Sequence, residues 1–149
     1  MNKKPIIILA IVLAAVLVIS AVGFILYQNL KPSFLGDISK AEIILQTSER
    51  HSDADIMNAV RLVKKSFAAN FGGCTLNKLY YDDEMSLKEE DYVKSDYDVA
   101  EAIVLYSEFH SGAAREDSGL NANSEYTHWN WVVVKSKDGE WKLETWGHP

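Results

Sequence analysis

The stretch HSDADIMNAVRLVKKSFAANFGG, residues 51–73, contains the clearest helix pattern in the chain. Its apolar residues recur at spacings of four, three, four and four, which places them on one face of a helix with a period of 3.6 residues. They are Ile56, Val60, Val63, Phe67 and Phe71, and Ala59 lies beside them. A helix with one apolar face must bury it, so this stretch predicts a helix packed on a second layer.

Both ends of this helix are marked. Ser52 or Asp53 can cap the N-terminus, where Asp53 and Asp55 also suit the positive end of the helix dipole. Gly72 and Gly73 follow the last apolar residue and can adopt the positive φ that ends many helices. We therefore expect the helix to end before the two glycines.

Short apolar segments around the helix predict strands. They are AEIILQTS (41–48), CTLNKLYYDD (74–83), VAEAIVLYSEFH (99–110) and a closing hairpin over 126–147 that turns at Lys137-Asp138-Gly139. The acidic stretch 84–98 has weak helical character and is open to two interpretations, a surface helix or an ordered excursion. Residues 111–125, rich in Gly, Ser, Asn and Asp, form a long connection.

This order of elements predicts an α+β domain over residues 41–149. One main helix packs across a curved antiparallel sheet whose last three strands form a meander. The predicted architecture is a roll of the cystatin-like or nuclear transport factor 2-like kind.

An apolar segment precedes the domain. Residues 5–27 carry no charge, and the 22 residues from Ile6 to Tyr27 form a run that spans about 33 Å as a helix, enough to cross a bilayer. Lys3 and Lys4 place the short N-terminal side in the cytoplasm. The sequence predicts a cytoplasmic stub and transmembrane signal-anchor over 1–28 and a tether over 29–40. The domain is then extracytoplasmic, on a single-pass cell-membrane protein.

A cleaved secretory signal is the alternative interpretation. Its apolar part is typically about 7–15 residues and ends at small residues. The run here is longer and ends in the bulky GFILYQNL, although Ser20, Ala21 and Gly23 leave cleavage near them open. We favour the uncleaved anchor.

Composition limits the possible partners. Two of the 15 lysines and arginines precede the apolar run, which leaves 13 against 21 Asp and Glu, a net charge of about −8 outside the membrane. Nucleic acid and anionic lipid headgroups require basic surface, so we expect neither as a ligand. Cys74 is the only cysteine and is expected to be a small buried hydrophobe, with a dimer disulfide or a reactive thiol as alternatives.

Three segments resemble one family. They are FGGCTLNKLYYDDE (71–84), AIVLYSEF (102–109) and YTHWNWVVVK…GEWKLETWG (126–147). Over residues 41–148 the chain is similar to a group of uncharacterised membrane-anchored proteins and lipoproteins of Gram-positive, clostridia-type bacteria. The resemblance implies an extracytoplasmic domain with this fold, and it implies no reaction and no functional residues.

All four tryptophans lie between Trp129 and Trp146, in the closing hairpin. If Asp138-Gly139 is a two-residue loop, Trp131 faces Trp146 and an aromatic patch lies among charged residues. If Gly139 takes the left-handed position after a type I turn, the pairing slips by one residue.

In this second register Val133 faces Leu143, Lys135 faces Trp141, and Trp131 faces Thr145. We favour it because it gathers the apolar side chains on one face. It leaves Trp146 on the reverse face.

Candidate ligand contacts follow from the predicted roll, which commonly leaves a cavity between its helix and its sheet. Residues that can bring a polar tip or an exposed ring to a ligand are Tyr80, Tyr106, Tyr126, His128 and Trp146. The histidines lack metal-ligand spacing, and no nucleophile, phosphate or dinucleotide motif is present, so we predict no catalytic residue, metal or cofactor.

These observations predict a membrane-anchored binding or interaction module for an envelope protein or cell-wall ligand. The first alternative is a small hydrolase or isomerase, which requires a large cavity with one inward carboxylate or histidine. The second is a purely structural envelope protein, which requires neither a pocket nor an apolar patch.

Overall fold

A computed structural model describes residues 4–30, 35–112 and 118–148, and describes the side chains of the first helix from residue 12 to 25. The chain divides into two units, Met1–Lys31 and Pro32–Pro149. The first contains the 27-residue helix α1 (Lys4–Leu30). Across the described parts of the chain, no helix has both the length and the apolar character needed to span a membrane.

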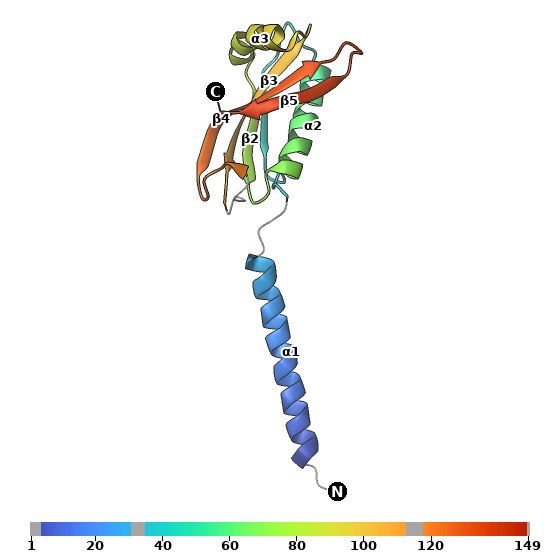
Figure 1. The fold of residues 1–149 in the computed structure, drawn as a ribbon, viewed down its shortest axis with the longest axis vertical. Coiled ribbons are helices and arrows are strands. Elements are labelled where there is room, and N and C mark those ends of the chain that lie inside the picture. The colour runs from blue at the N-terminus through green and yellow to red at the C-terminus, as the bar shows by residue number, and fades with distance from the viewer. Residues whose placement is uncertain (1–3, 31–34, 113–117, 149) are drawn as a thin grey trace. The chain divides into compact units, whose positions relative to one another are not determined.

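The second unit is a five-stranded sheet with one helix on each face (Figure 1). The strands lie in sequence order across the sheet. The elements are β1 (Glu42–Leu45), α2 (Asp53–Asn70), β2 (Thr75–Tyr81), α3 (Asp83–Tyr97), β3 (Ala102–His110), β4 (Glu125–Lys135) and β5 (Trp141–Gly147). The α+β class is confirmed, and the acidic stretch forms a surface helix.

The expectation of an antiparallel sheet is wrong at β1. This strand pairs with β2 in parallel, with Glu42 opposite Lys78 and Leu45 opposite Tyr81. The 18-residue helix α2 carries the chain back from the end of β1 to the start of β2, so that both strands run the same way. The other neighbouring strands are antiparallel, and the sheet is therefore mixed.

Helix α2 begins and packs as predicted. The Ser52 side chain accepts a hydrogen bond from the Asp55 backbone N–H at 3.1 Å, which caps the helix. All five residues of the predicted apolar stripe, and Ala59 beside them, are buried against the sheet. Gly73, just beyond the helix, has a φ of 81°, in the region that favours glycine.

Aromatic side chains fill the space between α2 and the sheet. Phe67, Phe109 and Trp131 are fully buried, and the Phe67 ring lies against the rings of the other two. Cys74 is buried in the same core, as expected, and burial raises the pKa of its thiol. These side chains pack in the region between α2 and the sheet where a cavity was expected.

A second, smaller apolar cluster lies on the opposite face, beneath α3. Val93 of α3 packs there with Val104 of β3 and with Val132 and Val134 of β4. Because successive residues of a strand point to opposite faces, β3 and β4 supply both clusters.

The hairpin follows the favoured register near its turn. Val133 lies opposite Leu143 and Lys135 lies opposite Trp141, as predicted. Gly139 has a φ of 85°, which agrees with the left-handed position that this register requires.

Farther from the turn the favoured register is wrong. The pairing shifts by one residue at Glu144, so that Trp131 lies opposite Trp146 and not opposite Thr145. The extra residue in β5 is a β-bulge, which moves Trp146 to the α2 face. Trp146 therefore packs on Trp131, with ring centroids 5.8 Å apart.

The segment predicted as a tether bonds to the domain from Gly36 onward. The Gly36 N–H donates to the Ala68 carbonyl at 3.0 Å, and the Asp37 N–H donates to the Cys74 carbonyl at 2.8 Å. A Cβ atom at Gly36 would lie 2.5 Å from the Phe67 carbonyl oxygen, so this close approach requires glycine.

Candidate functional site

Two of the predicted ligand contacts, Tyr80 and Tyr106, lie on the α3 face and not between α2 and the sheet. They are cross-strand partners, and their rings stack with centroids 5.7 Å apart. Both lie on the same face as Val104, two residues before Tyr106, because side chains alternate along β3. Burial raises the pKa of both phenols, and Glu108 and Asp82 raise that of Tyr80 further.

Two others, Tyr126 and His128, are separated by a bulge in β4. His128 has a φ of 55°, is exposed, and lies where the pairing of β3 with β4 shifts by one residue. The shift brings Tyr126 to the same face as Trp129, whereas an unbroken strand would separate them. The Tyr126 hydroxyl accepts a hydrogen bond from the Asn121 N–H at 2.8 Å and so holds the preceding connection.

Tyr126, Trp129 and Trp146 form what we call the aromatic surface. It begins where α2 ends, at Phe71, whose ring lies 6.1 Å from Trp129 and 6.2 Å from Trp146. Trp146 is 42% exposed, and the other two are half-buried. Beyond the end of the helix these rings cover the core, and Trp146 is the most exposed of them.

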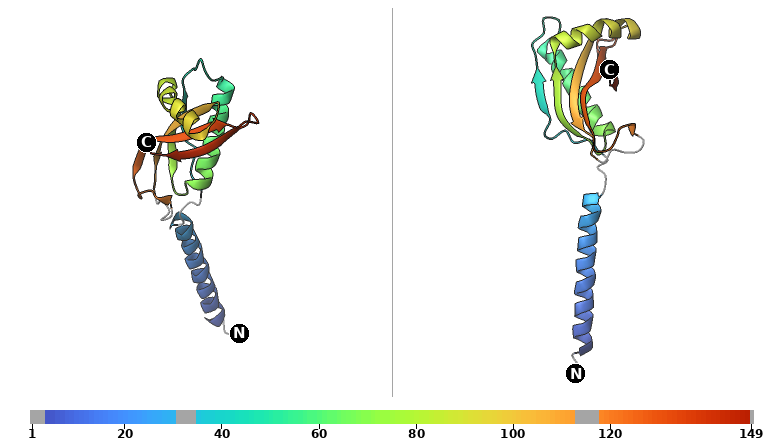
Figure 2. Two further views of the ribbon diagram at one scale, coloured as in Figure 1. Left: turned by 45° about the horizontal axis from the view of Figure 1, so that its top comes forward. Right: turned by 90° about the vertical axis from the view of Figure 1, so that its left-hand side faces the viewer.

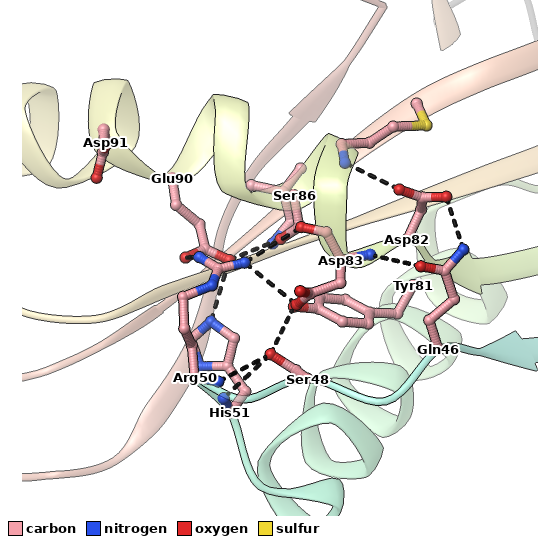
Figure 3. A network of polar contacts seen from close by, with 12 residues as sticks. Gln46, Ser48, Arg50, His51, Tyr81, Asp82, Asp83, Ser86, Glu90 and Asp91 are labelled. Atoms are coloured by element: carbon pink, nitrogen blue, oxygen red, sulfur yellow. Dashed lines mark hydrogen bonds and ion pairs between the residues drawn. The ribbon is translucent and has the colours of Figure 1, made fainter.

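A second candidate, the ion cluster, lies at the carboxyl ends of the parallel strands β1 and β2 (Figure 3). We define it as Arg50, His51, Tyr81, Asp83, Ser86 and Glu90. Ligands often bind at the carboxyl ends of parallel strands, which makes this position notable. Sequence patterns did not single out any of these residues as a site.

Glu90 is the centre of the ion cluster and is fully buried. Its carboxylate accepts hydrogen bonds from His51 Nε2 at 3.0 Å, from Ser86 Oγ at 2.7 Å and from the Arg50 guanidinium. Arg50 also donates to the Asp83 carboxylate at 3.2 Å. Figure 3 shows Glu90 pointing from α3 toward the loop between β1 and α2. The cluster therefore ties α3 to that loop.

The surroundings of Glu90 keep it ionised. Burial alone would raise its pKa, but the hydrogen bonds from His51 and Ser86 and the nearby positive charges outweigh burial and lower it. Burial raises the pKa of the neighbouring Tyr81 to about 12, and its hydroxyl donates to Asp83 at 2.7 Å.

The ion cluster resembles a general base in one respect only, a histidine held by a carboxylate. An ionised Glu90 requires the His51 proton on Nε2, which leaves Nδ1 to act on a substrate. Yet Nδ1 is buried, and within residues 35–112 and 118–148 it has no hydrogen-bond partner. Among the described residues, no three His, Cys, Asp or Glu side chains are placed to hold a metal ion. We interpret the cluster as a structural brace.

The shifted pKa of Glu90 makes stability depend on pH. A carboxyl with a lowered folded-state pKa contributes stability above its unfolded value, here 4.5, and loses it as pH falls through the folded value. We expect the free energy of unfolding to drop between pH 5 and pH 3, and to drop less in Glu90→Gln. Urea denaturation at each pH measures this, and equal slopes for both proteins would refute the assignment to Glu90.

No protein-family model, no curated protein and no solved structure matches the chain. Function must therefore be inferred from the residues themselves.

Proposed function

We propose that the protein is a membrane-anchored, extracytoplasmic binding module that holds its ligand on the aromatic surface. The observation that carries this proposal is Trp146, which packs on Trp131 and Phe71 yet leaves 42% of its area exposed. An exposed indole with rigid aromatic support loses little conformational entropy when it binds, and tryptophan is enriched among residues that dominate binding energy.

We propose that the protein is a single-pass membrane protein. The uncharged run from Ile6 to Tyr27 and the lysines before it support an anchor with the domain outside the cell. We also propose that the domain is a variant of the cystatin-like or nuclear transport factor 2-like roll. The main helix packed on strands that lie in sequence order supports this proposal. The parallel pairing of β1 with β2 is the feature that differs from the antiparallel sheet predicted for such a roll.

The size of the aromatic surface favours a sugar ring over a protein partner. Aromatic side chains offer about 150–250 Å² each when fully buried, so these three partly buried rings expose on the order of 200 Å². A stable protein interface needs about 800 Å² from each partner. The C–H face of a sugar ring, by contrast, fits on one or two rings, whose π-faces are weakly negative. The ligand we propose is therefore a cell-wall glycan.

The alternative of an enzyme with an internal active site is not favoured. Such an enzyme requires a carboxylate or histidine that points into a large cavity. The buried carboxylate and histidine that the structure describes, Glu90 and His51, are instead hydrogen-bonded to each other. The space between α2 and the sheet is packed around Phe67 and Trp131. A purely structural role is less favoured because Trp146 remains exposed.

Trp146→Ala is expected to weaken glycan binding by about tenfold or more, since the loss of one stacking ring costs about 1.4 kcal/mol or more. The measurement is titration of the purified full chain, in detergent, with soluble fragments of bacterial cell wall. Tyr92→Ala is the matched control, because Tyr92 is 72% exposed and lies on α3, outside the aromatic surface.

If the wild type and Trp146→Ala bound the cell-wall fragments with equal affinity, the aromatic surface would not be the binding site. A different outcome is that no glycan fragment binds and that the chain captures an envelope protein, which Trp146→Ala no longer captures. The aromatic surface would then be the binding site, but its ligand would be a protein.

A further inference from the structure

The edge of the sheet at β1 offers backbone groups for pairing. In the part of the chain that the structure describes, this four-residue strand pairs on one side only, with β2 (Figure 2, right-hand view). The Gln46 N–H donates inward, to the Tyr81 carbonyl. Since backbone groups alternate in direction along a strand, Ile43 and Leu45 turn their N–H and C=O groups outward.

A pocket lies beside this edge on the α2 face. It has a volume of about 310 Å³, and its apolar wall consists of Leu45, Ile56 and Met57. Asp53 lies at the same pocket. Met57 is 43% exposed although it is a large apolar side chain, so the pocket offers apolar area that the fold itself does not use.

A second pocket lies beside the same edge on the α3 face. Its volume is about 260 Å³, and Ile44 of β1 and Tyr80 of β2 line it. Its charged lining consists of Asp82 and Glu108 against Lys78, whose ammonium is 3.1 Å from Glu108. The pocket therefore carries a net negative charge.

We propose that β1 is a docking edge for an extended peptide segment of a partner protein, which adds to the sheet as a further strand. Successive side chains of an added strand point to opposite faces of the sheet. One would enter the apolar pocket on the α2 face and the next would enter the acidic pocket on the α3 face. This is strand addition, in which main-chain bonds give affinity and alternate pockets give specificity.

The pockets define the chemistry of the segment. The α2-face pocket accepts an aliphatic side chain, and the α3-face pocket accepts a lysine or arginine beside Asp82 and Glu108. The segment is thus an extended peptide with neighbouring apolar and basic residues. A second copy of this chain fits less well, because its own β1 reads EIIL and offers no basic side chain.

The site is independent of the aromatic surface, and it is tested with the full chain in detergent. A phage library of random heptapeptides is panned against the protein, and the enriched sequences are synthesised. We expect alternating apolar and basic residues. Methylation of every second backbone nitrogen on the pairing side should weaken binding more than tenfold, because it removes the donors that pair with β1.

Protein variants test the two pockets. Met57→Ala and Glu108→Gln should each weaken peptide binding about three- to tenfold, since each removes one pocket contact. Leu87→Ala is the matched control, because Leu87 is 44% exposed and lies on α3 away from both pockets. Trp146→Ala should leave peptide binding unchanged.

Three results would overturn the proposal. The first is a library that yields no enriched peptide. The second is a methylated peptide that binds as well as its parent. The third is a chain that self-associates and is dissociated by an EIIL peptide, which would make a second copy the occupant.

Discussion

Glu90→Ala is expected to destabilise the domain by about 3–5 kcal/mol, the usual cost of removing one partner from a buried ion pair. The substitution leaves His51 and Ser86 without the carboxylate that each contacts, and leaves Arg50 with the Asp83 carboxylate alone. The free energy of unfolding of a typical protein is only about 5–15 kcal/mol, so a loss of this size brings the domain close to unfolding.

Denaturant unfolding of the full chain measures this loss. Asp91→Ala is the matched control, because Asp91 is the next residue of α3 and its carboxylate is 80% exposed. This substitution should change the free energy of unfolding by less than about 0.5 kcal/mol. Glu90→Gln keeps the shape of the side chain and should fall between these two variants. If Glu90→Ala were as stable as Asp91→Ala, the ion cluster would not brace α3.

Trp131→Ala is expected to cost about 3–5 kcal/mol, the range for truncating a large aromatic core residue. Trp131 is completely buried, and its indole N–H donates to Ser107 Oγ at 2.8 Å, so the substitution leaves both a cavity and an unpaired hydroxyl. Trp146→Ala removes the same side chain from a site that is 42% exposed, and should cost only about 1–2 kcal/mol.

The comparison of these two variants by urea denaturation tests how the indoles are distributed. Comparable losses for Trp131→Ala and Trp146→Ala would mean that Trp146 belongs to the core and is not available to a ligand.

Much of the fold was predictable because periodicity is a local property of the sequence. The stripe from Ile56 to Phe71 predicted α2 and its buried face, and Ser52 predicted its cap. The direction of β1 was not predictable in this way, because the period of a strand is the same in parallel and antiparallel sheets. Only the crossover through α2 fixes that direction.

The tryptophans show what a single residue changes. The turn at Gly139 predicted the pairing of Val133 correctly, but no pattern predicted the bulge at Glu144. One extra residue reverses every later side chain, so Trp146 lies on the α2 face and not on the reverse. The bulge at His128 has the same effect on Tyr126.

The ion cluster was missed because its partners are distant in sequence and each, taken alone, is typical of a solvated surface. Arg50 and Glu90 are 40 positions apart. One signal was present in α3: Ser86, Glu90 and Val93 recur at helical spacing, and all three are buried. A carboxylate on such a stripe indicates a buried partner.

Acrylamide quenching of tryptophan emission, with and without soluble cell-wall fragments, tests the central claim that the aromatic surface binds the ligand. We predict protected, blue-shifted emission from Trp131 and Trp141 and a quenchable fraction that Trp146→Phe reduces, since Trp146 is the most exposed indole in the described structure. The fragments should protect that fraction in the wild type. A quenchable fraction that is unchanged in Trp146→Phe, or that the fragments leave unprotected, would contradict the claim.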